Sequence, residues 1–461
     1  MKKWYTILAG ILCAALATPA GAADVPAYNC DYQPSCEVAP GIYGKMSSPV
    51  TSKFKLSIGG FVRLDYAYNS VNFGANGAQS PISGAIPAKR ITADAARAYS
   101  ATYANQSQSI FTARSSRLWL KSEGPTFLGA RTGALLEADF YGDPSAGAES
   151  PMFRMRHAYA TLDWERTQIL FGQYWDIFGP MLAATIDFRN GDSYGTPNQQ
   201  RVPQIRLTQK LHLFGDSDLK LVFGVQDPNQ FGNNQAAVTG GYGPAVNVAS
   251  QIYYMKKGMG NAPGMFGLSM NPLTVGLFGL YGTEKAASNG NRHLDSWGYG
   301  FYSFVPLLAS RDGKCRAMTM SFEGEAYAAA NMAFNFATAV AVVGTNPGAV
   351  SNTLDPAGNQ TPAKGFGYNA QLIFYPTQDL GLTTGYGSRN ALNYGSYAGL
   401  SNFQKSSSEL YVNLSYDFNA AIRLAAEYQN LKTDYGNVNG VHGASATGSD
   451  NSLRLVAFYF F

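Results

Sequence analysis

The chain has 461 residues, and its composition departs from that of an ordinary soluble protein. Charged residues make up 14%, where about 25% is usual, while aromatic residues reach 13% and glycine occurs 50 times. The formal net charge is +4 without a concentrated basic face, which argues against a nucleic-acid partner. Beyond the N-terminus no run of about 18 apolar residues occurs, which argues against a helical membrane protein.

The first 22 residues have the three parts of a secretory signal peptide. Two lysines stand at 2–3, residues 7–17 are apolar, and Ala20-Gly21-Ala22 offers the small residues that signal peptidase reads. The apolar part is shorter than the roughly 20 residues that a membrane anchor needs. A lipoprotein signal at Cys13 lacks the small residue expected directly before the cysteine. We therefore expect residues 1–22 to be removed and the rest of the chain to be exported.

Residues 23–50 are rich in proline and show no periodicity, which predicts an extension ahead of the strands that follow. Cys30 and Cys36 lie close together in it and can close a disulfide in an oxidising compartment. Cys315 has no evident role. No C-x-x-C-H motif for haem attachment occurs, and His and Cys are too scattered for a metal site. We expect neither a cofactor nor a metal.

From residue 51 onward, strand-like segments alternate with turns. In the first segment one parity is apolar (Leu56, Ile58, Val62, Leu64) and the other polar (Lys55, Ser57, Arg63, Asp65). Side chains alternate between the two faces of a strand, so each segment has one apolar and one polar face. Residues 366–374, 409–418 and 422–429 repeat the pattern. With the low charge and high aromatic content, this predicts a transmembrane antiparallel β-barrel over 51–461, apolar towards lipid and polar towards the lumen.

We count about 16 such segments, and an even number is typical of a single-chain bacterial barrel. They begin near residues 54, 109, 131, 151, 167, 201, 218, 247, 272, 294, 316, 364, 379, 405, 420 and 449. Every second connection is generally short, as periplasmic turns are. The others are longer, notably 70–108, 177–200, 228–246 and 331–363, as extracellular loops are. The extension 23–50 is then periplasmic. Two of the periplasmic links, 259–271 and 306–315, are longer than expected, so the count could change by two strands.

The last twelve residues carry the most specific pattern. Apolar residues occupy every second position and end in Tyr459 and a C-terminal Phe461. This resembles the targeting signal that the barrel-assembly machinery recognises on outer-membrane proteins. Residues 114–120 (RSSRLWL), 153–159 (FRMRHAY) and 171–175 (FGQYW) are also porin-like. The mature chain thus resembles the 16-stranded porins of Gram-negative bacteria, and in particular their substrate-selective trimeric branch.

The resemblance implies an outer-membrane homotrimer in contact with lipid and lipopolysaccharide, through which small hydrophilic solutes and ions diffuse passively. It also implies that the loop after the fifth strand, residues 177–200, folds into the barrel and forms the constriction. Asp187, Arg189 and Asp192 would then line that constriction. The alternative for this loop is an exposed extracellular position.

The alternation places a set of charged side chains on the lumen faces of the first six strands: Arg63, Arg117, Glu137, Asp139, Arg154, Arg156 and Arg206. Guanidinium groups stay charged and match carboxylates geometrically, so an arginine ladder facing loop acids would favour small anions such as carboxylates. The alternative is that some of these arginines merely pair with Glu137 and Asp139. The same alternation puts His157 on the lipid face or at a subunit interface.

Two other functional classes fit the sequence less well. A barrel enzyme needs a histidine paired with a serine or with acids at the rim, and none of the four histidines has that setting, so we expect no enzyme. A structural barrel could act as a sheath for an electron-transfer complex, or as an adhesin. A sheath needs a lumen wide enough for a protein, and about 16 strands argue against it.

Overall fold

The computed structural model describes residues 54–71, 107–142, 152–186, 195–197, 201–227, 241–242, 246–286, 292–330, 364–392, 403–438 and 441–461. The predicted signal peptide and extension lie outside these residues, as do Cys30 and Cys36. Within the described residues the strands are β1 (Lys55–Asn69), β2 (Gln108–Thr112), β3 (Arg117–Phe127), β4 (Ala130–Asp139), β5 (Arg154–Asp163), β6 (Thr167–Trp175), β7 (Arg201–His212), β8 (Ser217–Gln226), β9 (Gly241–Tyr242), β10 (Asn247–Pro263), β11 (Met270–Ala286), β12 (Arg292–Leu308), β13 (Thr319–Ala330), β14 (Lys364–Tyr375), β15 (Leu380–Ala391), β16 (Phe403–Asp417), β17 (Ile422–Val438) and β18 (Val441–Phe460). A 3₁₀ turn, η4 (Met265–Gly267), lies between β10 and β11.

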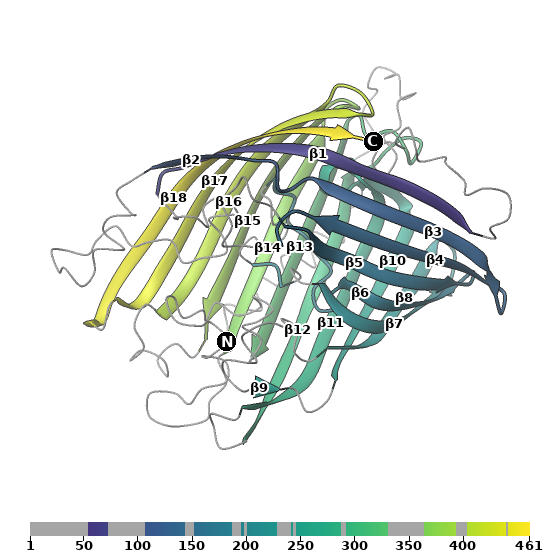
Figure 1. Cartoon of the computed structure of the whole chain (residues 1–461), viewed down its shortest axis with the longest axis horizontal. Coiled ribbons are helices and arrows are strands. Elements are labelled where there is room, and N and C mark those ends of the chain that lie inside the picture. Colours follow the sequence, from purple (N-terminus) through teal and green to yellow (C-terminus); the bar gives the residue numbers. More distant parts are fainter. Residues whose placement is uncertain are drawn as a thin grey trace.

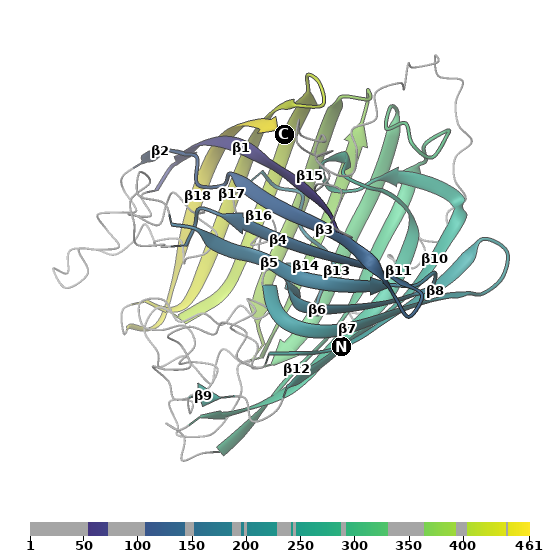
Figure 2. The same cartoon turned by 45° about the vertical axis from the view of Figure 1, so that its right-hand side comes forward.

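The strands form one closed antiparallel barrel (Figures 1 and 2). β1 closes it by pairing with β18 from Phe61 opposite Phe460 to Asn69 opposite Ser452. β2 and β3 are two parts of one crossing strand, because both pair with β1 and only residues 113–116 separate them. β9 is two residues long and pairs with the end of β11. The predicted count of 16 crossing strands is therefore confirmed.

The two faces of the wall have opposite character, as the alternation predicts. On β16, Leu410, Val412 and Leu414 are exposed by 41%, 47% and 42%. Their neighbours Glu409 and Asn413, on the inner face, are exposed by only 1% and 3%. A soluble protein would bury the apolar set. An apolar outer surface over a polar interior is the arrangement of a barrel in a lipid bilayer.

Strand length differs around the barrel. β4, β5, β6 and β8 have 9 or 10 residues, close to the roughly 9–11 that a tilted strand needs to cross a bilayer. β10, β11, β12 and β17 have 17 residues and β18 has 20, and Figure 1 shows these long strands as the taller wall. None of the helical structure in the described residues has the length and hydropathy of a membrane span.

The C-terminal residue completes the closing seam. Phe461 and Gly60 exchange two backbone hydrogen bonds of 3.0 and 3.1 Å. Because an added Cβ on Gly60 would lie 2.6 Å from the Phe461 ring, the ring packs directly on the glycine. Recognition of Tyr459 and Phe461 by the assembly machinery stays a prediction.

Cys315 is disulfide-bonded, and it is the sole cysteine among the described residues. The Cys30–Cys36 disulfide also stays a prediction.

Leu207 and Thr208 on β7 test which face meets lipid, because Leu207 is 44% exposed on the outer face and Thr208 points inward. We expect Leu207→Arg to lower the free energy of unfolding by about 2–4 kcal/mol, because it places a cation in the apolar core of the bilayer. Thr208→Arg places the same group in a polar lumen and should cost much less. Urea unfolding of the barrel in lipid vesicles measures both, and equal costs would contradict the assignment of faces.

Candidate functional site

The connection after β6 runs inside the barrel. It leaves the wall at Asp176, and Ile177, Phe178 and Met181 are fully buried. The described part ends at Ile186, which is 3% exposed. A loop lying in water outside the barrel would not bury these side chains. The first part of the predicted constriction loop thus lies in the lumen, whereas Asp187, Arg189 and Asp192 are outside the described residues.

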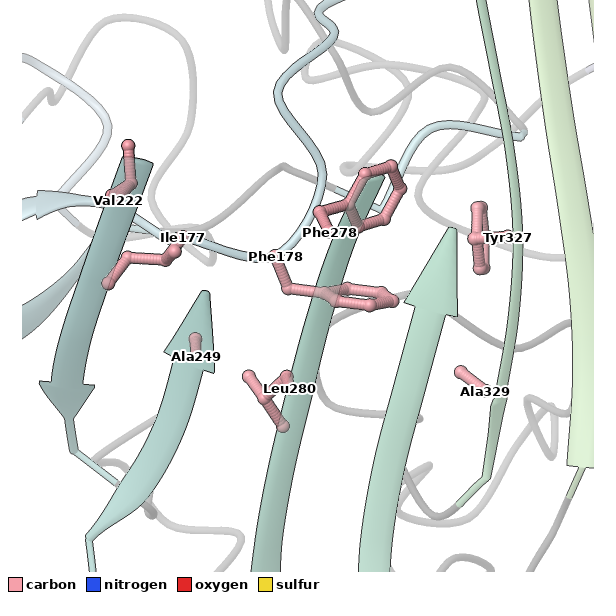
Figure 3. Packing of buried hydrophobic residues seen from close by; sticks show 8 residues of the cluster. All are labelled: Ile177, Phe178, Val222, Ala249, Phe278, Leu280, Tyr327 and Ala329. Carbon is pink, nitrogen blue, oxygen red and sulfur yellow. The ribbon is translucent and has the colours of Figure 1, made fainter. Parts of the chain in front are cut away.

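An apolar cluster attaches the start of this inner segment, residues 176–186, to the wall (Figure 3). The Phe178 ring meets Phe278 of β11 and Tyr327 of β13 edge-on, with centroid distances of 5.1 and 6.0 Å. Ile177 packs beside Gly224 of β8, where an added Cβ would come within 2.4 Å of Ile177 Cδ1. Edge-on aromatic pairs add to the stabilisation from burial. The segment is therefore held from its first residues against β8–β13.

Polar side chains of the wall bind the backbone of the rest of the inner segment. The backbone N–H groups of three residues donate to Glu325, Gln371 and Glu427 on β13, β14 and β17, at 3.1, 2.8 and 3.0 Å. Asn413 of β16 donates to the Ala184 carbonyl at 2.6 Å. A buried backbone polar group requires such a partner. The segment therefore follows the wall from β8 to β17 and leaves the β3–β7 wall uncovered by it.

A later part of the same connection also lies against the barrel wall. Gly195 has φ +100°, and an added Cβ would come within 2.0 Å of the Tyr368 carbonyl of β14. Only glycine combines that backbone conformation with such a close approach. Thr196 beside it is fully buried. The connection thus contacts β14 both at Ala184 and again at Gly195.

Four of the predicted arginines lie beside acids on the uncovered wall and at its β1 edge. Asp139 forms ion pairs with Arg154 and Arg156 at 2.6 and 3.0 Å. Glu137 accepts from Arg156 at 2.6 Å and lies 3.8 Å from Arg117. Arg63 pairs with Asp65 and also donates to the Ile186 carbonyl. Charges buried in this way need partners, so these pairs hold the wall together.

The position predicted for His157 is wrong. The pairing of β4 with β5 shifts at Arg156, so that Glu137 lies opposite His157 and Ala138 lies opposite Met155. This is a β-bulge, in which one extra residue reverses the alternation beyond it. His157 is 7% exposed and packs against the Tyr174 ring at 5.1 Å. Arg156 and His157 therefore both face inward, although strict alternation places neighbouring residues on opposite faces.

Three cations on β7 and β8 form no ion pair with any carboxylate that the structure describes: Arg201, Arg206 and Lys220. Each lies over an aromatic ring instead, at 4.8 Å from Trp175, 5.0 Å from Tyr174 and 5.4 Å from Tyr253. Arg206 also donates to the Trp175 carbonyl at 2.7 Å. A ring of this kind holds a cation by its face but does not neutralise it as a paired carboxylate would.

Sequence reasoning found Arg206 but missed Arg201 and Lys220. Strict alternation from Arg206 assigns Arg201 to the opposite face, yet it lies near enough to Arg154, Arg156 and Arg117 to interact with their charges. Lys220 does have the lumen parity of Val222 on β8, so a search for lysines as well as arginines would have found it.

Asp176 stands at the start of the inner segment and is 2% exposed. Its carboxylate accepts hydrogen bonds from the backbone N–H of Phe178 at 2.8 Å and from Gln226 at 2.9 Å. Burial nevertheless raises the pKa of Asp176 to about 6, because these bonds do not replace the lost hydration. Its negative charge, near Arg206, is therefore present above that pKa and absent below it.

We expect any preference for anions in this lumen to weaken as the pH rises from about 5 to about 7, because Asp176 then becomes charged. Asp176→Asn keeps the shape and should remove that pH step. The reversal potential of the reconstituted protein across a salt gradient, taken at both pH values, measures it. A step of the same size in the variant would assign the titration to another group.

No family model matches the chain, and no curated protein matches it. Solved structures do match. The outer membrane channel DcaP of Acinetobacter baumannii is similar with a TM-score of 0.61 at 19% identity, over 90% of this chain and 99% of that chain. The anion-selective porin from Comamonas acidovorans is similar with a TM-score of 0.52 at 11% identity, over 88% of this chain and 100% of that chain. The fold of this chain is thus that of outer-membrane porin channels.

Proposed function

We propose that this protein is an outer-membrane porin through which small hydrophilic solutes and ions diffuse passively, with a preference for small anions such as carboxylates. The fold, the apolar outer surface and the inner segment that narrows the lumen support the channel. One observation carries the anion preference: three acids of β13 and β17 are buried beside the inner segment, whereas Arg201, Arg206 and Lys220 on the other side form no ion pair with a described carboxylate.

The covered acids are Glu323, Glu325 and Glu427, which are exposed by 9%, 3% and 1%. Glu325 and Glu427 accept backbone hydrogen bonds from the inner segment, and Glu323 accepts from Tyr302 at 2.8 Å. They lie behind the inner segment and are shielded from a solute in the passage. Their negative charge therefore opposes the cations of β7 and β8 only weakly.

The cations suit this role by their chemistry as well as their charge. A guanidinium presents a planar set of donors that matches a carboxylate, and it remains charged at any relevant pH. Selectivity in a channel depends on the charges at its narrowest part and on its radius. Arg154, whose side chain is 33% exposed despite its pair with Asp139, adds a further accessible guanidinium to this wall.

The alternative functions have less support. A sheath around an electron-transfer protein would need a free lumen, and residues 176–186 occupy part of it. No observation on the described residues supports an adhesin. Catalysis is not part of the proposal: His157 lies among aromatic rings, and His212 lies at the barrel end beside Asp218. Homotrimeric assembly, contact with lipopolysaccharide and use of the barrel-assembly machinery remain predictions from the family resemblance.

We expect Arg201→Gln and Arg206→Gln each to lower the ratio of anion to cation permeability. One unit charge about 4 Å from an ion in water contributes ~1 kcal/mol, which corresponds to roughly fivefold in that ratio. The measurement is the reversal potential across a KCl gradient, with the purified protein in a planar lipid bilayer. The substitution keeps a polar side chain and makes it shorter, so the passage should stay open.

Arg166→Gln is the matched control, because Arg166 lies in the β5–β6 turn with its side chain 60% exposed. It changes the net charge equally and should leave the permeability ratio unaltered. An unaltered ratio in the Arg201 and Arg206 variants would disprove the anion filter while keeping the channel. Absence of conductance from the folded wild-type barrel would reject the channel itself.

A further inference from the structure

The connection between β10 and β11 folds back into the barrel. Their pairing shifts between Lys256 and Asn261, so that residues 257–260 form a large bulge. Beyond the bulge the two strands pair again, from Asn261 opposite Pro272 to Pro263 opposite Met270. A backbone hydrogen bond of 2.8 Å from Gly264 to Ser269 closes the tip, which contains η4. We call residues 261–272 the inward hairpin.

The inward hairpin is buried where a turn in water would be exposed. Ala262 is fully buried, and the Pro263 carbonyl accepts a hydrogen bond of 2.6 Å from Ser321 of β13. By contrast, the β7–β8 turn at the same end of the barrel leaves Phe214 72% exposed. A turn that only joins two strands needs about two to five residues. The extra length of the inward hairpin is used to reach across the barrel.

The tip of the inward hairpin packs against the two buried clusters that contain the end of the inner segment. Met265 packs against a buried cluster that contains Ala184 of that segment. Phe266 packs against a second cluster that contains Ile186 of that segment together with Ala425 and Val456 on β17 and β18. The inner segment thus has the barrel wall on one side and the hairpin tip at its end.

A group of buried charges holds the tip in place. Arg423 of β17 donates to the Phe266 carbonyl at 3.3 Å and pairs with Asp417. Arg316, which is 2% exposed, binds the same carboxylate at 3.1 Å. The Arg316 side chain lies so close to Gly267 that an added Cβ would come within 2.3 Å of its Nη1. Links from the β12–β13 connection, β16 and β17 therefore converge on one turn.

The backbone of Phe266 adds to this picture. Its φ of +51° lies in the left-handed region, which a non-glycine residue adopts only at an energetic cost. A glycine would adopt it freely. Since the surroundings impose this conformation, it serves to direct the ring towards the cluster of Ile186, Ala425 and Val456. The fold therefore maintains the position of the Phe266 ring as well as the turn itself.

We propose that the inward hairpin is a second positioning element of the constriction: it holds the end of the inner segment in place and narrows the lumen beneath it. This rests on the proposed function as a channel. The passage is then bounded by the arginine-bearing β3–β7 wall on one side. Its other side is formed by two elements distant in sequence, the inner segment and the hairpin tip.

The test is Phe266→Gly, which removes the ring and keeps the backbone conformation without strain. We expect a higher single-channel conductance, with added transitions between sub-conductance levels, because Ile186 loses its support. The reversal potential should stay at the wild-type value, since no cation of β7 or β8 is changed. Phe266→Leu retains an apolar contact and should restore wild-type conductance.

Phe214→Gly is the matched control, because it removes the same ring from an exposed turn at the same end of the barrel. Folding of each variant is checked first by heat-modifiable migration on gels. Wild-type conductance and noise in Phe266→Gly would overturn the inference and leave the channel standing. Absence of conductance from the folded wild-type protein would instead reject the proposed function. If Phe266→Gly does not fold, Met265→Ala probes the contact with Ala184, and wild-type conductance there would also overturn the inference.

Discussion

A segment that crosses the interior of a barrel carries backbone N–H and C=O groups away from any strand partner. Each one left buried and unpaired costs about 1–3 kcal/mol, so the path of such a segment is determined by where partners exist. In this protein the partners are Glu325, Gln371 and Glu427, which accept its N–H groups, and Asn413, which donates to its Ala184 carbonyl. They lie on β13–β17, and the asymmetry of the lumen follows from their placement.

The placement of these hydrogen-bond partners also affects the electrostatic field in the lumen. The carboxylates that bind the inner segment are thereby covered, so they contribute little to the field in the passage. On the opposite wall, Asp139 and Glu137 neutralise part of the positive charge and fix Arg154 and Arg156 in place. Arg201, Arg206 and Lys220 lie over aromatic rings, which hold a cation without cancelling its charge. A requirement of folding thus covers acids on one wall, while these three cations form no ion pair with a described carboxylate on the other.

The interior packs around two elements that enter from different connections. The inner segment is attached to β11 and β13 by Phe178 and ends at Ile186. The inward hairpin meets it there through Met265 and Phe266. Both elements are held by apolar contacts on the inner side of the wall. The apolar residues of the strands that face lipid are therefore separate from those that hold the constriction.

The sequence by itself determined the barrel. A lipid-facing wall needs an apolar side chain at every second position, and this local requirement predicts the 16 strands and the faces of Leu64 and Leu414. Only the tertiary structure decided which side chains come together at the candidate site. The bulge at Arg156 reverses the alternation and turns His157 inward, and Arg201 lies near the inward arginines despite its parity. The length of the connection at 259–271 was visible in the sequence, but its packing against the clusters that contain Ala184 and Ile186 was not. Alternation predicts which way the side chains of one strand point. Which charges form ion pairs, which are covered by the inner segment and which stay exposed depends on residues far apart in the chain.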